Sequence, residues 1–563
     1  MTDAATDAGE RPSRLITLLV ATGALLALAA LAPLIFQRDS VATIDTAIKL
    51  IQSSELARTG FQSMALPYPA RDLDPAEHFL PLGAPFVFLS AGKWHSIFPS
   101  FYAVVAAPLR LYGVEWLVAL AVVGAVVAVT ATTWLPGAHP VAGALVLLAT
   151  PMWLYGLNPT ETTLALGCVT AALVVATRVQ GARGDWIAGL LLGVGTLLRD
   201  ESLLLAPGLL YARHLTGASV RHLARVVVGV GAPIVLMAVV DQWWFDRPML
   251  AHLRHAVPGF DQLLPRSRAR LPALAVMGWH DRLSTIVEYW LLGFGGLAAG
   301  AALAAWLGLA HGLRRLTPVL VAALALTAVV LHAVDLASLV PAPRIMPGLL
   351  RLSPFLLLAV LPRAGGEPAP ALVRLAWVTA GCYLAAVGLT LNTAGGKDVG
   401  PRLIIGLWPL LAAAAVETLS SYVIAARRSG TARVTALSGV VLVAGSLVMQ
   451  LGVVLPARSG RNADDAEAAR VLRAIGDQVI VMDGLFDIDV AGGLFFERKL
   501  MLGQPSQWPA LSQTLSRHQI DRFTYIARLP GATPRFPHYR RAEVWEPGRF
   551  VISRWVRETS TSP

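Results

Sequence analysis

Long apolar segments separated by short polar turns run along most of this 563-residue chain. The first covers residues 15–36, and the later ones cover residues 116–135, 141–155, 162–176, 186–198, 203–212, 226–240, 286–309, 319–334, 345–361, 375–391, 403–425 and 434–455. A helix of about 20 residues crosses a bilayer core of about 30 Å. Leu, Ala, Val and Gly dominate these segments, without the alternation that a membrane barrel requires. The pattern predicts an all-α polytopic membrane protein with about 13 transmembrane helices.

After residue 456 the pattern becomes that of a soluble domain. The stretch "DAEAARVLRAIGDQVIVMDGLF" predicts an amphipathic helix followed by a buried strand at residues 479–482. The stretch "PALSQTLSRHQIDRFTYIARL" repeats that order, with a strand near residues 523–527. We expect residues 1–456 to form the transmembrane module, including an extracytoplasmic loop at residues 37–113, and residues 457–563 to form a small extracytoplasmic α/β domain.

Charge sets the expected orientation. The chain is 55% hydrophobic and 14% charged, with a net charge of +11, and its arginines lie mostly in short turns between apolar segments. Such arginines mark the cytoplasmic side, so the basic charge indicates topology in an inner or plasma membrane and not a nucleic-acid partner. A cytoplasmic N-terminus requires that residues 97–112 do not cross the bilayer completely. It then places on the cytoplasmic side Arg178, Arg183, Arg213, Arg221, Arg225, Arg314, Arg315, Arg363, Arg374, Arg427, Arg428 and Arg433.

The segment after the first apolar run is polar, acidic and rich in proline. In "IDTAIKLIQSSELARTGF", Asp45, Lys49 and Gln52 stand at helical spacing. The same helix has an apolar stripe, formed by Ile48, Ile51 and Leu56. Such a helix can lie along a membrane surface. The prolines and aromatic residues that follow predict an ordered loop, which returns to the interface through "GKWHSIFPSFY".

Two features inside apolar segments have structural interpretations. Cys168 and Cys382 are expected to be unpaired, small buried residues. Gly189 and Gly193 form a GxxxG pattern, which lets two helices approach closely.

Several stretches follow one another in a fixed order and on the same expected side of the membrane. They are the first apolar helix with an acidic residue just outside it, the interfacial helix with "SIFPSFYAVVAAPLRLYG", then "NPTETTLALG", "GLLLGVGTLLRDESLLLAPG" and "GGKDVGPRLIIGLWPLLAAAA". In this order they resemble the lipid-dependent membrane glycosyltransferases of the GT-C type. These include the aminoarabinose transferase-like and protein O-mannosyltransferase-like enzymes and the dolichyl-phosphate-mannose mannosyltransferase group. The resemblance covers residues 15–455, and it departs from the family where Pro99 has no adjacent proline and where Thr46, not an acid, follows Asp45.

The resemblance implies a GT-C-like fold and the transfer of a hexosyl or pentosyl group from a polyprenyl-phosphate donor to a lipid, glycan or protein acceptor on the extracytoplasmic face. Such a transfer needs a carboxylate to accept the acceptor's proton and cationic groups for the departing phosphate. Asp45 is the expected base, and Asp39 is the alternative base. Glu161 is expected to orient the acceptor or to share a divalent cation, Mg²⁺ or Mn²⁺, with Asp45. Whether a metal or another cofactor is used stays open at this point.

Arg402 is the expected phosphate clamp, because a guanidinium is always charged and grips phosphate oxygens through two hydrogen bonds. An interfacial arginine whose head reaches the headgroup region is the alternative interpretation. Arg344 and Lys397 are secondary candidates for the same phosphate.

The remaining candidates lie near the expected acid pair. Arg199 and Glu201 either contact the substrate or pair with each other to hold the wall of the site. Lys49 and His95 are further candidates for substrate binding, and His95 is otherwise an interfacial residue.

A transporter or flippase for lipid-linked glycans is the alternative function. Transporters commonly carry charged or broken helices near the membrane midplane. In this chain the acidic residues near membrane depth gather at one face instead. The expected partners are therefore a polyprenyl-phosphate sugar, its acceptor and membrane lipids.

Overall fold

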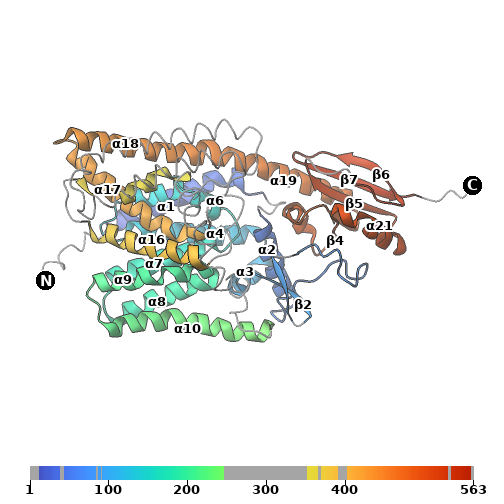
Figure 1. Ribbon diagram of the computed structural model, residues 1–563, viewed down its shortest axis with the longest axis horizontal. Helices are drawn as coiled ribbons and strands as arrows, with labels where there is room; N and C mark the ends of the chain where they lie inside the picture. The colour runs from blue at the N-terminus through green and yellow to red at the C-terminus, as the bar shows by residue number, and fades with distance from the viewer. Residues whose placement is uncertain are drawn as a thin grey trace, which may run out of the picture.

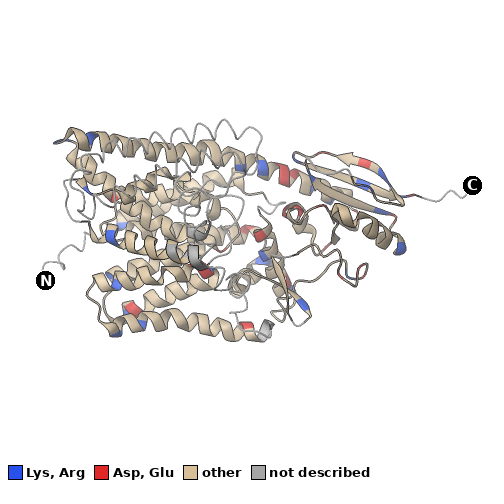
Figure 2. Ribbon diagram, viewed as in Figure 1, with Lys and Arg blue, Asp and Glu red and all other residues tan. Residues whose placement is uncertain are grey.

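The computed structural model describes residues 12–37, 43–83, 86–90, 92–245, 352–364, 369–390, 402–529 and 534–558. In these residues a helical bundle and a smaller part with a β-sheet lie end to end (Figure 1). Lys, Arg, Asp and Glu are sparse along the bundle helices and more frequent at helix ends and in the sheet-containing part (Figure 2). The expected spans at residues 286–309 and 319–334 lie outside the described residues.

Apolar helices build the bundle. Their bounds are α1 (Arg14–Ile35), α4 (Val114–Thr133), α7 (Thr162–Arg178), α8 (Gly181–Leu198), α10 (Val220–Phe245), α16 (Ala371–Thr390) and α17 (Trp408–Ala425). α4 packs on α7, α7 on α8, and α8 on α10. Within the described ranges, five helices are long and apolar enough to cross a membrane, which supports a polytopic membrane protein. The expected total of about 13 crossings stays a prediction.

Glycines determine how closely α8 and α10 approach. A Cβ atom on Gly193 would lie 2.7 Å from the carbonyl oxygen of Val230. A Cβ atom on Gly189 would overlap the carbonyl oxygen of Val226. The interpretation of the GxxxG pattern as a close-packing motif is confirmed.

Some expected spans are broken. Residues 141–155 form two short helices, α5 (Val141–Leu148) and α6 (Met152–Gly156), because Pro151 lacks the N–H that a continuous helix would use. Several other expected spans begin with or contain a 3₁₀ turn: η1 (Asp200–Leu205) precedes α9 (Ala206–Leu215), η4 (Pro354–Val360) lies within residues 345–361, and η6 (Arg402–Leu407) precedes α17. Cys168 and Cys382 are both unpaired as expected, but neither is buried, since Cys168 is half-buried and Cys382 is exposed.

Two helices of the first loop, α2 (Ile44–Arg58) and α3 (Ser100–Arg110), lie between the bundle and the sheet (Figure 1). α3 has 11 residues. Since a helix rises about 1.5 Å per residue, α3 is about 16 Å long, which agrees with the expectation that residues 97–112 do not cross the bilayer completely. A short hairpin, β1 (Val87–Ser90) with β2 (Lys93–Ser96), precedes α3. α2 is buried over most of its length and is not an exposed surface helix.

One long helix joins the bundle to the sheet. α18 (Gly430–Leu447) continues through a π-helical segment, η7 (Val448–Val454), into α19 (Leu455–Ile475). The remaining elements are β3 (Val479–Met482), η8 (Leu485–Asp487), α20 (Ile488–Ala491), η9 (Gly492–Leu494), β4 (Lys499–Leu502), η10 (Pro505–Gln507), α21 (Trp508–Arg517), β5 (Arg522–Arg528), β6 (Tyr539–Trp545) and β7 (Phe550–Arg557). The strand order is β4-β3-β5-β7-β6, with β3 parallel to β4 and β5, and with β7 antiparallel to β5 and β6. The expected small α/β unit, with its strands near residues 479–482 and 523–527, is confirmed.

The sheet has an apolar core on each face because residues alternate along β3. On one face, Ile480 and Met482 pack with residues of α19 and with Ile44, Ile48 and Ile51 of α2. On the other face, residues of α21 pack with the first loop's Tyr68, Leu73 and Phe79. The first loop and the C-terminal sheet therefore share both cores.

Candidate functional site

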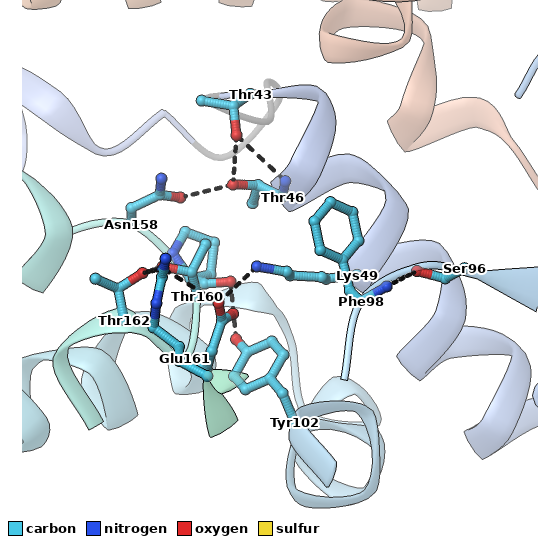
Figure 3. A network of polar contacts seen from close by, with 12 residues as sticks. Thr43, Thr46, Lys49, Ser96, Phe98, Tyr102, Asn158, Thr160, Glu161 and Thr162 are labelled. Atoms are coloured by element: carbon cyan, nitrogen blue, oxygen red, sulfur yellow. Dashed lines mark hydrogen bonds and ion pairs between the residues drawn. The ribbon is translucent and has the colours of Figure 1, made fainter. Parts of the chain in front are cut away.

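The candidate site lies where α2 meets the turn that precedes α7 (Figure 3). Thr43 caps α2, since its Oγ1 accepts a hydrogen bond from the backbone N–H of Thr46 at 3.2 Å. Thr46 Oγ1 then donates to Oδ1 of Asn158 at 3.1 Å. Tyr102 of α3 donates its hydroxyl to the carbonyl oxygen of Pro159 at 2.8 Å. These bonds hold α2, α3 and the turn at residues 158–161 in one arrangement.

A buried ion pair forms the centre of the site. Lys49 Nζ lies 2.7 Å from Glu161 Oε1, and the two side chains are only 6% and 3% exposed. The ammonium group of Lys49 also lies 4.5 Å from the centre of the Phe98 ring. Such a position favours a cation, because the ring face is electron-rich. Figure 3 shows Lys49 extending from α2 towards Glu161 with Phe98 beside it.

Arg199, at the end of α8, adds a further charge beside Lys49 and Glu161. These three residues, with Asp45 and Glu201, form what is called the charged row below. Its Nη1 lies 3.6 Å from Glu161 Oε1 and donates to Thr162 Oγ1 at 2.9 Å. Its Nε donates to Glu201 Oε1 at 2.9 Å. Arg199 and Glu201 therefore form the predicted pair, and this pair is part of the same network as Lys49 and Glu161.

The charges in this row determine the ionisation of Glu161. Burial disfavours its charged form, but Lys49 and Arg199 outweigh burial and hold the pKa of Glu161 below its ordinary value. Burial lowers the pKa of Lys49, and the carboxylates of Glu161 and Asp45 oppose that effect. Glu161 is consequently an ionised carboxylate that two cations neutralise, which makes it a poor proton acceptor.

The second carboxylate oxygen of Glu161 is available to accept a hydrogen bond from a ligand. Oε2 is buried and has no hydrogen-bond partner among the described residues. A buried carboxylate oxygen without a partner is costly, so it is a natural place for a hydroxyl or amine of a ligand.

Asp45 lies one helical turn before Lys49, in the first turn of α2, and is 6% exposed. Its negative charge acts on Lys49. The structure thus gathers five of the predicted residues around the start of α2 and the turn before α7: Asp45, Lys49, Glu161, Arg199 and Glu201.

His95 has a different environment. It is buried in β2, with its ring 5.7 Å from the ring of Phe88. Burial, and then the charge of Lys93, lowers the pKa of His95 to about 4. At neutral pH this imidazole is therefore uncharged, and it does not supply a positive charge for a phosphate.

The structure describes the other expected phosphate ligands only in part. Arg402 opens η6, whose backbone lies against α7 and η1 and so close to the charged row. The structure does not describe the Arg402 side chain, and Asp39, Arg344 and Lys397 lie outside the described residues. Their roles stay predictions.

A divalent cation also stays a prediction. In the described part of the chain, no three His, Cys, Asp or Glu side chains gather as metal ligands. Lys49 and Arg199 already neutralise Glu161, which is a poor setting for a further cation.

Three site residues were not singled out from the sequence: Thr46, Asn158 and Tyr102. Each lies in a stretch quoted above, and "NPTE" in particular carries Asn158 three residues before Glu161. A polar residue in the same turn as the expected acid is the signal that could have identified Asn158.

Comparisons with known proteins give a likeness to one class of enzyme. No protein-family model matches the chain. No curated protein matches it either. Among solved structures, the chain is similar over nearly its whole length to a GT-C glycosyltransferase, the class that the sequence resembles.

That glycosyltransferase is the aminoarabinose transferase ArnT from Cupriavidus metallidurans. Its crystal structure bound to undecaprenyl phosphate gives a TM-score of 0.45 and 12% identity, covering 95% of this chain and 97% of that chain. The structure of its apo state gives a TM-score of 0.45 and 13% identity, covering 96% and 97%. A likeness at this level does not define a reaction or a site for the present chain.

Proposed function

We propose that this protein is a membrane glycosyltransferase that moves a sugar from a polyprenyl-phosphate donor to an acceptor on the extracytoplasmic face. The observation that carries the proposal is the row of charges at the junction of bundle and sheet, in which Asp45, Lys49 and Glu161 are buried and Arg199 and Glu201 are half-buried. Burying so many ionised groups is expensive, and such groups near a membrane usually serve a site. ArnT, which was crystallised with undecaprenyl phosphate, agrees with a donor of this class.

In this proposal Asp45 accepts the proton of the acceptor hydroxyl. The acceptor oxygen attacks the anomeric carbon, the bond from that carbon to the phosphate oxygen breaks, and polyprenyl phosphate leaves. Glu161 is the weaker candidate for the base, because Lys49 and Arg199 keep its pKa low. Glu161 instead holds the two cations in place and offers Oε2 to a sugar or acceptor hydroxyl.

Lys49 and Arg199 are the described cations that can stabilise the departing phosphate. Arg402, and with it Arg344 and Lys397, would complete the phosphate site. Asp39 is the alternative base.

The test is incubation of purified protein with a panel of polyprenyl-phosphate sugars and acceptors, with mass spectrometry of released polyprenyl phosphate. Asp45→Asn should reduce release by about 10²–10⁴-fold, the usual contribution of a general base. Asp72→Asn, which alters a 59% exposed carboxylate of the same loop, should leave release unchanged. Full activity of Asp45→Asn would transfer the role of base to another residue, and binding of donors without any release would favour the transporter instead.

A further inference from the structure

A second face of α2, about 100° around the helix from Lys49, rests on one short segment of the C-terminal part. This segment, residues 485–494, comprises η8, α20 and η9, and all three turns contact α2. Ile44, Ile48 and Ile51 of α2 share an apolar core with Ile488 and Leu494. α2 therefore faces the site with one stripe of residues and residues 485–494 with the neighbouring stripe.

Residues 485–494 contain little regular structure, since α20 has only 4 residues. Besides the apolar core, two arginines hold the segment: Arg461 of α19, whose Nη2 lies 3.9 Å from Asp489 Oδ2, and Arg528 at the end of β5, which makes more of the contacts. Arg528 Nη2 donates to Asp489 Oδ2 at 2.9 Å, and Arg528 Nε lies 3.2 Å from Asp487 Oδ1. Arg528 also donates to the carbonyl oxygen of Phe486.

The surroundings keep this arginine in place. Its guanidinium lies 5.9 Å from the ring centre of Phe486 and 5.6 Å from that of Phe550. Asp487 in turn accepts the backbone N–H of Gly484 at 2.9 Å, which closes the turn after β3. An arginine that grips two carboxylates and a carbonyl in one turn has few alternative conformations.

We propose that Arg528 is a positioning residue for the site: by pinning residues 485–494 it fixes α2, and so places Lys49 and Asp45 against the turn at residues 158–161. The C-terminal sheet is then a structural part of the site and not a separate module. This inference concerns the geometry of α2 and holds whatever reaction the site performs.

The first measurement is amide hydrogen exchange of residues 44–58 in the full-length protein in detergent. Arg528→Ala should speed exchange in α2 by about 10-fold or more, because it removes charge-assisted hydrogen bonds. Arg528→Lys should restore part of the protection, since it keeps the charge but not the two-pronged grip. Asp489→Asn, which neutralises the partner of both Arg528 and Arg461, should give a smaller increase than Arg528→Ala and replaces it if Arg528→Ala does not fold.

A matched control lies in the same strand. Arg522 opens β5, and its Nε lies 3.2 Å from the buried Asp477, at the end of the strand away from Arg528. Arg522→Ala removes an ion pair of similar length without touching residues 485–494. It should leave exchange in α2 unchanged.

The second measurement reports on Lys49 itself. Acylation of Lys49 as a function of pH, followed by mass spectrometry, measures the pKa and accessibility of its amine. Arg528→Ala should raise both labelling and pKa, because a loosened α2 exposes Lys49 to water, and Arg528→Lys should partly reverse the change. Folded Arg528→Ala protein with wild-type exchange in α2 and wild-type labelling of Lys49 would overturn the proposal. Neither measurement uses sugar transfer, so a failure of the proposed function would not imitate this result.

Discussion

The ion pair between Lys49 and Glu161 yields a quantitative prediction, because both partners are buried. Across the 2.7 Å between Lys49 Nζ and Glu161 Oε1, the attraction before desolvation is about 6 kcal/mol at an effective dielectric constant of about 20. Arg199, at 3.6 Å from the same oxygen, adds about 5 kcal/mol. Glu161 thus loses both attractions when it is neutralised, whereas removal of Lys49 leaves the attraction to Arg199.

Single substitutions should therefore differ in cost. Glu161→Gln should lower the free energy of unfolding by about 3–5 kcal/mol, the usual loss when one partner of a buried pair is removed. Lys49→Met should cost about half of that, because Arg199 still neutralises Glu161. The double variant should be more stable than Glu161→Gln alone, since it does not leave the buried Lys49 ammonium without its nearest counter-charge.

The assay is denaturant unfolding in detergent, followed by tryptophan fluorescence, as a double-mutant cycle. A second pair on the same helix provides the control: Arg58 Nε lies 2.9 Å from Glu55 Oε2, but the Arg58 side chain is 61% exposed. Its coupling energy should be at most about 1 kcal/mol, whereas that of Lys49 and Glu161 should be at least about 2 kcal/mol. Equal coupling in the two pairs, or a double variant as unstable as the sum of the singles, would refute the reasoning.

Three further predictions concern pH and packing. Burial raises the pKa of Asp487 to about 7 even though Arg528 opposes the shift, so its contribution to stability is fully present near pH 4 and is lost as the pH rises through 7. The free energy of unfolding should therefore be up to about 3 kcal/mol lower at pH 8 than at pH 5, and Asp487→Asn should abolish that difference in denaturant unfolding. Burial lowers the pKa of His95 to about 4, so the pH dependence has the opposite sign from that of Asp487. The free energy of unfolding should fall by up to about 3 kcal/mol as the pH drops from about 6.5 towards 4, and His95→Gln should remove that fall. Gly189→Ala should lower the melting temperature in detergent, because its Cβ would overlap a backbone carbonyl. Gly231→Ala on α10 is the control: its Cβ meets nothing within 4 Å, so the melting temperature should stay unchanged or rise.

Local patterns predicted the elements well where each element has its own periodicity. The apolar runs at residues 15–36 and 116–135 became α1 and α4 nearly unchanged, and the buried strand at residues 479–482 became β3. β6 was missed because it is an edge strand whose residues 540–544 are exposed, so no alternation marks it. The breaks in the expected spans came from proline and from 3₁₀ turns that hydropathy does not report.

The site could be predicted only in part, because some of its contacts join residues that are far apart in the sequence. Arg199 and Glu201 are two residues apart, so their pairing could be proposed from the sequence alone. The pairing of Lys49 with Glu161 joins positions 112 residues apart. The hydrogen bond from Thr46 to Asn158 joins the same two segments. Such a contact follows from the packed fold and not from any local pattern.

The position of α2 explains why a polar, proline-rich loop follows the first membrane helix. Its sequence carries two stripes with the same spacing and an offset of one residue: the apolar residues Ile44, Ile48 and Ile51, and the polar residues Asp45, Lys49 and Gln52. An offset of one residue turns a stripe by about 100° around the helix, so the two stripes face different neighbours. The apolar stripe enters the core of the sheet, and Lys49 of the polar stripe reaches the turn before α7. Because the two neighbours lie 300 residues or more apart along the chain, α2 makes its full set of contacts only when the turn before α7 and the C-terminal sheet are both in place, which is the physical basis for the proposed dependence of the site on that sheet.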